Sequence, residues 1–310
     1  MKKSNVTAGY ALGRRCNASI KQYLAAAFAE NTVRAYRSDV VRFIAWGGKI
    51  PCSPHCVARY IAHHAPLLSS TTLTRRLSAI AWAHTSKGLP SPTHSLLVKA
   101  TLKGIRRSCA RRVRQAAALD KTHVVQMVRR CTGLRGMRDR ALLLIGFAGA
   151  LRRSELIGIN VDDIEFFAEG LVLHLRRSKT DQEGQGREVA IPRIRGKFCP
   201  CRCLSEWLAA AGIQEGAVFR SINQFDQASS QRLSGQSVAL IIKRHVQRIG
   251  LDPKNFSGHS LRAGFVTTAA QRGVASSTIR NQTGHKSDAM VQHYMRTARQ
   301  FSDNANKRIW

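Results

Sequence analysis

The spacing of apolar residues changes partway along this chain, and that change limits the folds available to it. From about residue 18 to 107, apolar side chains recur at helical spacing in short segments separated by Ser, Thr, Pro and Gly. Between residues 162 and 192 the sequence instead contains three strand-like stretches, DDIEFF, GLVLHLRRS and REVAIP, joined by polar turns. Helical spacing resumes at Leu204 and continues, with interruptions, to the terminus. The sequence therefore predicts a mainly α fold with a small antiparallel β-sheet.

Capping and turn residues mark the ends of the expected helices. Asn31 is the predicted N-cap of TVRAYRSDVVRFIAW, a helix that Gly47 and Gly48 would end. Further helices are predicted at residues 53–64, 70–85, 91–106, 122–131 and 137–148, with another that begins after Leu151.

A basic segment separates the chain into two halves. RRSCARRVRQAAALD, residues 106–120, has many positive charges but few bulky apolar side chains, so it suits a linker better than a core element. A chain of 310 residues also exceeds what one core usually organises. We expect a flexible N-terminus at 1–17, a helical domain at 18–107, a basic linker at 108–118 and a second domain at 119–310.

The net charge indicates a polyanionic partner. The chain has 50 Lys and Arg against 18 Asp and Glu, a formal net charge of +32. These basic residues are spread along the whole chain, and no apolar stretch reaches the about 18 residues of a membrane span, so we expect nucleic acid and no membrane. Binding should weaken strongly as salt rises. We expect a cytoplasmic protein. The plainer alternative to a nucleic-acid partner is an unusually basic soluble protein.

The cysteines predict free thiols. Eight cysteines in a chain of this length do not resemble a disulfide scaffold. Cys199, Cys201 and Cys203 form the one cluster whose spacing suggests zinc. Their single-residue gaps fit poorly with the usual spacers, and no matching His or Cys pair follows closely, so we expect no metal.

The second half of the chain contains the residue types needed to cut a DNA strand without hydrolysis. That reaction requires a nucleophile, cations around the phosphate, and an acid for the departing sugar oxygen. His259 and Arg262 are three residues apart, so in a helix they share a face and can converge on one phosphate. The candidates, in chain order, are Arg152 and Glu155 in GALRRSEL, Lys179 in SKTD, His259 and Arg262 in GHSLR, His285 in GHKS, and Tyr294 in HYMR.

Each candidate alone also has a plainer interpretation. Arg152 stands in a chain rich in arginine, and a lysine in a turn, such as Lys179, is usually solvent-exposed. His285 follows Gly284 at the start of an expected helix, where histidines often cap or pack. The spacing around Tyr294 is typical of a buried helix face. The combination in fixed order favours the catalytic interpretation, because several independent weak matches rarely coincide.

In this order, the residues resemble those of the tyrosine recombinase (phage integrase) family. SGHSLR, GHKS and VQHYMR are most similar to its Cre-type and bacterial integrase branches. TVRAYRSDVVRFIAW resembles the opening of the family's helical core-binding (SAM-like) DNA-binding domain, so the resemblance covers nearly the whole chain. It implies a two-domain architecture, with residues 18–107 as the DNA-binding domain and 119–310 as a mixed α/β catalytic domain ending in a bridging segment.

The resemblance also implies a role for each candidate. The implied roles are phosphate binding for Arg152, Arg262 and His285, protonation of the leaving hydroxyl for Lys179, proton removal for His259, nucleophilic attack for Tyr294, and orientation of the basic residues for Glu155. Cleavage and rejoining through a covalent 3′-phosphotyrosine needs no metal, cofactor or ATP. Two departures stand out: Cre-type enzymes can have Trp at the position of His285, and the turn around Lys179 aligns poorly, which leaves Lys197 and Lys286 as alternatives.

The resemblance implies an assembly as well. Family members act as homo-tetramers on two double-stranded DNA sites, and an accessory directionality protein is a further expected partner. The last segment, RQFSDNANKRIW, has apolar residues suited to packing on a neighbouring protomer, although a frayed tail is equally consistent; these are Phe301, Ile309 and Trp310. Three rivals remain: a type IB topoisomerase-like enzyme, a catalytically idle DNA-binding protein of the same fold, and a metal-dependent nuclease or transposase. The last would need a cluster of carboxylates with metal spacing, which this acid-poor sequence does not offer.

Overall fold

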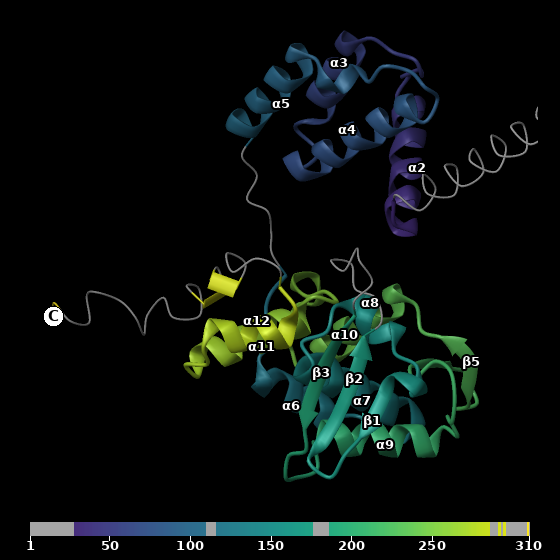
Figure 1. Ribbon diagram of the computed structural model, residues 1–310, viewed down its shortest axis with the longest axis vertical. Helices are drawn as coiled ribbons and strands as arrows, with labels where there is room; N and C mark the ends of the chain where they lie inside the picture. The colour runs from purple at the N-terminus through teal and green to yellow at the C-terminus, as the bar shows by residue number, and fades with distance from the viewer. Residues whose placement is uncertain are drawn as a thin grey trace, which may run out of the picture. The chain divides into compact units, whose positions relative to one another are not determined.

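The chain divides into two compact units, residues 1–114 and residues 115–310. The computed structural model describes residues 28–109, 116–175 and 186–285, together with 291, 292, 294, 295 and 309. Figure 1 labels the elements of both units, and each unit is considered by itself. Across these ranges the molecule is mostly helical with small antiparallel sheets, as the sequence predicted. No helix within them is long and apolar enough to cross a membrane.

The first unit is built from helices alone in its described part. Helix α2 packs against α4, and α3 packs against α5, around a core that contains Phe43 and Tyr60. Asn31 was wrongly predicted as a cap: α2 begins earlier, after Ala29, and Asn31 lies in its first turn. The predicted helix at 91–106 is also interrupted, because the Ser95 hydroxyl caps a new helix. The elements are α2 (Glu30–Ala45), α3 (Pro54–His64), α4 (Ser70–Thr85), η1 (Pro92–His94) and α5 (Leu96–Ser108).

A buried carboxylate ties two of these helices together. The Asp39 side chain on α2 is fully buried, and Arg75 of α4 donates to both of its oxygens, at 2.8 Å and 3.2 Å. Arg42 donates to it from the next turn of α2, at 3.2 Å. Buried charges require such partners, so this ion pair fixes the register of α2 on α4.

The second unit combines helices with a three-stranded sheet. Helix α7 lies at its centre: Leu142, Leu143 and Ile145 have no exposed surface, and α6, α9 and α11 pack around them. The helices are α6 (Lys121–Arg129), α7 (Gly133–Ala148), α8 (Arg153–Gly158), η2 (Val161–Asp163), α9 (Pro200–Ala210), α10 (Gly235–Arg248), η3 (Pro253–Asn255), α11 (Ser260–Gln271) and α12 (Ser276–Thr283).

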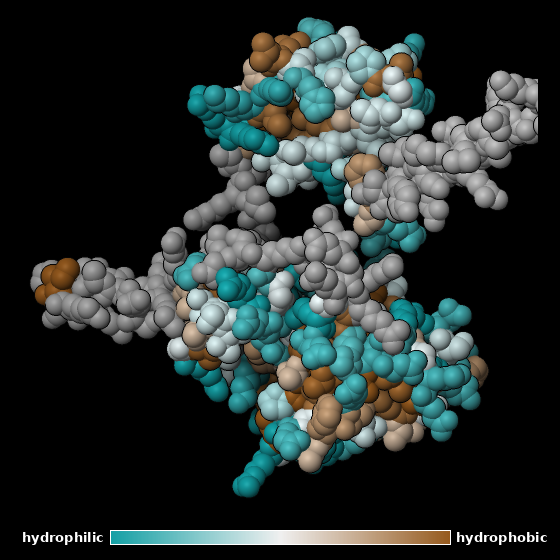
Figure 2. Space-filling model, viewed as in Figure 1, coloured by the Kyte–Doolittle hydropathy of each residue, from teal (hydrophilic) through white to brown (hydrophobic). Residues whose placement is uncertain are grey.

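The sheet has the order β1-β2-β3, with both pairs antiparallel. The three predicted strands are confirmed as β1 (Ile164–Phe166), β2 (Gly170–Leu175) and β3 (Arg187–Pro192). One face of the sheet packs on the core, and Figure 2 shows hydrophobic patches on the visible surface over the sheet region of this unit. The register pairs Leu175 with Arg187, so the segment between β2 and β3 leaves the sheet beside Arg187.

One interruption of the helical segments expected beyond Leu204 contains strands that the sequence did not predict. A second, two-stranded sheet forms from β4 (Arg220–Ile222) and β5 (Ala228–Arg232). These strands are short and polar, and neither buries a full face, so they lack the alternation by which strands are recognised.

Candidate active site

Arg152 is placed by a sharp turn between α7 and α8. Ala150 adopts a left-handed backbone conformation, φ 47°, which costs energy for a residue with a Cβ and redirects the chain. Arg152 then caps α8: its backbone N–H donates to Glu155 Oε2 at 2.8 Å, and its Nη1 donates to Glu155 Oε1 at 2.5 Å. The sequence pair Arg152 and Glu155 is thus one unit, in which the carboxylate orients the guanidinium.

Glu155 is held ionised by two arginines. Only 4% of the residue is exposed. Burial by itself would raise the pKa of Glu155, but the charge of Arg187 and the hydrogen bonds from Arg152 outweigh it and hold the pKa below its ordinary value. Arg187 Nη2 donates to Oε2 at 3.0 Å. The Glu155 carboxylate therefore holds the guanidinium groups of Arg152 and Arg187 close together.

The C-terminal end of α12 collects three guanidinium groups. The last carbonyls of a helix have no partner within it, and they form the negative end of the helix dipole. Gly284 ends α12 in the left-handed conformation, φ 62°, and a Cβ there would lie 3.0 Å from the Arg187 side chain. Three successive carbonyls each accept from one arginine: Gln282 from Arg187 Nη1 at 2.8 Å, Thr283 from Arg262 Nη1 at 2.6 Å, and Gly284 from Arg152 Nη2 at 3.1 Å.

Arg262 is the most buried of the three arginines. It lies in the first turn of α11, is 6% exposed, and also donates from Nη1 to the Ala150 carbonyl at 2.8 Å. Burial first, and then repulsion from Arg152, lowers the pKa of Arg262 to about 10, so it remains a cation at neutral pH. Its Nη2 is buried without a hydrogen-bond partner among the described residues, which leaves a donor for an anion.

The two predicted histidines occupy different surroundings. His259 is exposed at the N-cap of α11, and its backbone N–H donates to Ser257 Oγ at 3.2 Å. It is therefore much more open than Arg262, three residues later. His285 follows the end of α12, and its Nδ1 lies 2.7 Å from Thr283 Oγ1. Burial, and then the charge of Arg262, lowers the pKa of His285 to about 4, so the ring is neutral at neutral pH.

Tyr294 is half-buried against a small apolar cluster. The cluster includes Val266 of α11 and Ile279 of α12. Tyr294 also lies close enough to Arg262 for the negative charge of a tyrosinate to raise the pKa of Arg262. The structure thus brings Arg152, Glu155, Arg262 and His285 into one network, and it places Tyr294 within electrostatic range of Arg262.

Lys179 lies outside the described residues, as does the alternative Lys286. Leu175, the last described residue before Lys179, pairs with Arg187 at the start of β3. Lys197 is held at the other end of β3, where its Nζ lies 5.3 Å from the centre of the Phe198 ring. Cys201 Sγ donates to the Ile191 carbonyl at 3.3 Å and holds the segment that follows β3 against that end of the strand.

The cysteine cluster that suggested zinc has other partners. Cys199, Cys201 and Cys203 are all buried. The Cys203 thiol donates to the Lys197 carbonyl at 3.5 Å, and Cys201 bonds Ile191 as above. Across the described ranges, no group of three or more His, Cys, Asp or Glu is arranged to hold a metal ion.

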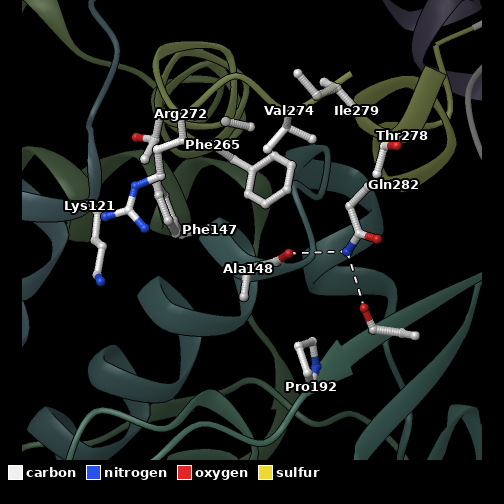
Figure 3. A pocket seen from close by; sticks show the side chains of 13 residues that line it. Lys121, Phe147, Ala148, Pro192, Phe265, Arg272, Val274, Thr278, Ile279 and Gln282 are labelled. Atoms are coloured by element: carbon white, nitrogen blue, oxygen red, sulfur yellow. Dashed lines mark hydrogen bonds between the residues drawn. The ribbon is translucent and has the colours of Figure 1, made fainter. Parts of the chain in front are cut away.

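Arg187, Gln282 and Thr283 were missed by the sequence analysis. Arg187 opens a strand in a chain with 50 basic residues, so nothing local distinguished it. Gln282 Nε2 donates to the carbonyls of Ala148 and Ala190, both at 3.2 Å, and so fastens α12 to α7 and β3 (Figure 3). The only available signal was position, since Gln282 and Thr283 directly precede the GHKS box.

A largely apolar pocket lies behind this fastening. It has a volume of about 390 Å³ and is lined by residues of α6, α7, β3, α11, α12 and the turn between the last two helices. In Figure 3 the rings of Phe147 and Phe265 face it, with Gln282 along one wall. Their ring centres are 6.0 Å apart in an edge-to-face arrangement. Gln282 is therefore shared between the pocket and the arginine network.

Comparison with solved structures identifies the class of fold. The chain is similar to the XerH site-specific recombinase bound to a palindromic difH substrate, with a TM-score of 0.64, 17% identity, and coverage of 88% of this chain and 78% of that one. It is also similar to a lambda integrase tetramer bound to a Holliday junction, with a TM-score of 0.61, 17% identity, and coverage of 95% and 81%. The class of fold is that of the two-domain tyrosine recombinases.

Sequence comparison then identifies the family. The model of the phage integrase family matches residues 117–300. Over 307 residues the chain is 36% identical to the integrase/recombinase XerD homolog of Selenomonas ruminantium. The alignment covers 96% of this chain and 90% of that protein. The chain belongs to the phage integrase family, and it is a tyrosine-type site-specific DNA recombinase.

Proposed function

We propose that the protein cleaves and rejoins DNA through a covalent 3′-phosphotyrosine on Tyr294, without metal or ATP, as a tetramer that joins two sites. The observation that carries the proposal is the convergence of three guanidinium groups and His285 at the end of α12, with Tyr294 within electrostatic range of Arg262. Three cations held in one place suit a phosphate whose charge increases in the transition state.

Each residue then has a distinct task. Arg152, Arg262 and His285 bind the scissile phosphate through its non-bridging oxygens. Glu155 orients Arg152 by its two hydrogen bonds. Tyr294 attacks phosphorus and displaces the 5′ oxygen, which Lys179 protonates. His259, exposed at the start of α11, assists removal of the Tyr294 proton. The phosphotyrosyl bond retains the energy of the phosphodiester, so rejoining needs no external source.

The first unit binds DNA in this proposal. Residues 18–107 act as the DNA-binding domain and 108–118 as the basic linker to the catalytic domain. The net charge of +32 supports extensive phosphate contacts, in the cytoplasm at the nucleoid. An accessory directionality protein would choose between outcomes such as integration and excision.

The pocket beside Gln282 supports the tetramer. Exchange between two duplexes requires four cleavages, and each protomer supplies one Tyr294. The pocket is apolar and about 390 Å³ in volume, which suits apolar side chains of a neighbour's last segment, RQFSDNANKRIW. One similar structure is a lambda integrase tetramer on a Holliday junction.

Strand exchange between two duplexes tests the proposal. The purified protein is incubated in EDTA, without ATP, with two labelled duplexes from the DNA that flanks its own gene, and with Tyr294→Phe as control. We expect recombinant duplexes from the wild type alone. In a parallel reaction on a supercoiled plasmid with the same sequences, relaxation without exchange of the duplexes would favour a type IB topoisomerase. Tight binding without cleavage would favour an idle DNA-binding protein. Exchange that requires added magnesium would contradict metal independence.

A further inference from the structure

Thr283 holds His285 through a buried hydroxyl. Thr283 is the last residue of α12 and has no exposed surface. Its Oγ1 lies 2.7 Å from the Ile279 carbonyl oxygen, one turn earlier, and 2.7 Å from His285 Nδ1. A longer contact, 3.3 Å, reaches the Arg280 carbonyl. One hydroxyl therefore contacts both the helix backbone and the imidazole.

These distances determine which atom donates to which. Two oxygens 2.7 Å apart need a proton between them, and a carbonyl oxygen has none to give, so Thr283 donates to Ile279. A hydroxyl has a single proton, so Oγ1 can only accept from His285. The Nδ1 of His285 must then be protonated. In the neutral ring, Nε2 is left with a lone pair and no proton.

Burial, and then the charges around the ring, keep His285 neutral in the free protein. His285 is within the field of Arg262 on α11, Arg152 before α8 and Arg187 on β3, all of which disfavour the imidazolium, while Glu155 on α8 favours it. Burial disfavours the charged form more than any of these. Phosphate oxygens only accept hydrogen bonds, so a bare Nε2 repels them.

We propose that Thr283 is a positioning residue that fixes the Nδ1–H tautomer of His285, so that His285 binds the scissile phosphate only after its Nε2 gains a proton. This inference rests on the proposed function, in which His285 contacts that phosphate. As the anionic phosphate enters, Nε2 takes one proton from solvent and a new N–H bond forms, with no bond broken in the DNA. The resulting imidazolium donates from Nδ1 to Thr283 and from Nε2 to the phosphate.

The tautomer can be measured without DNA. Nitrogen-15 NMR of the full chain with labelled histidine distinguishes the two tautomers, and His285→Ala identifies the signal. We expect Nδ1–H at His285 in the wild type and in Thr283→Ser, which keeps the hydroxyl. Thr283→Val, of nearly the same shape, should change the ring to the Nε2–H form that a free histidine side chain prefers. A wild-type ring in the Nε2–H form, or no change in Thr283→Val, would overturn the proposal.

The pH dependence of cleavage tests the consequence. In Thr283→Val the neutral ring can donate from Nε2, so it needs no added proton. The ratio of wild-type to Thr283→Val adduct formation on nicked duplex should rise as pH falls from 8 to 5, by up to about tenfold per pH unit. The ratio of wild type to Thr283→Ser should stay constant. A constant ratio for Thr283→Val contradicts the proposal. If no protein forms an adduct, the proposed function fails, and the NMR spectrum still decides the tautomer.

Discussion

Replacing Arg187 should slow DNA cleavage although the family motif does not include this residue. Arg187→Met keeps the length of the side chain but loses the hydrogen bond to Glu155 at 3.0 Å and the one to Gln282 at 2.8 Å. Hydrogen bonds to charged groups contribute about 1.5–3 kcal/mol each. If the loss of one such bond appears in the barrier, cleavage slows about ten- to a hundredfold.

A second arginine on the same segment provides a matched control. Arg193, just beyond the other end of β3, also donates to two backbone carbonyls, those of Ala168 at 3.0 Å and Phe167 at 3.4 Å. Arg193→Met should change the cleavage rate less than about twofold, because it leaves the network around Glu155 intact.

The assay is single-turnover formation of the covalent adduct on a nicked duplex, in which the released strand cannot rejoin. Binding of the same duplex is measured in parallel by fluorescence anisotropy. We expect Arg187→Met to lower the rate with little change in affinity. Equal effects of Arg187→Met and Arg193→Met, or no effect of Arg187→Met, would refute the assignment of Arg187 to the site.

Other changes test separate parts of the network. Glu155→Gln should lower the free energy of unfolding by about 3 kcal/mol at pH 7. Because the pKa of Glu155 lies below its ordinary value in the fold, the stability difference between wild type and variant should shrink as pH falls below about 4. Urea titrations in which this difference does not change with pH would argue against the role of Glu155. Gln282→Leu removes two hydrogen bonds at about 1 kcal/mol each and should speed hydrogen exchange in α12. Unchanged exchange would show that these hydrogen bonds do not stabilise α12. Lys179→Ala should slow adduct formation at least about a hundredfold, and Lys197→Ala less than twofold; a substrate whose leaving oxygen is replaced by sulfur should rescue the first, and failure to do so would mean that Lys179 is not the acid.

The sequence predicted the main architecture because its signals are local. Alternating hydrophobicity is clear in β2, where Leu171, Leu173 and Leu175 are buried, and the three strands were placed correctly. The hairpin of β4 and β5 was missed because its strands are short and polar. Such strands can be identified only from their pairing in the structure. Asn31 was misplaced as a cap because helix ends depend on backbone geometry that several nearby residues can satisfy.

The candidate site was predictable where a motif exists and not where contacts are long-range. Arg152, Glu155, Arg262 and His285 lie in recognisable boxes and form one network in the structure. Arg187 contacts Glu155 across 32 positions of sequence, a relation that spacing cannot reveal. The roles of the candidate residues remain predictions.

The most direct test of the central claim is to identify the residue that becomes attached to DNA. The protein is trapped on nicked duplex in EDTA, digested with trypsin, and the DNA-linked peptide is sequenced by mass spectrometry. We predict a phosphate ester on Tyr294 in the wild type and no adduct from Tyr294→Phe, which keeps the ring. An adduct on any other residue, or one that persists in Tyr294→Phe, would contradict the account.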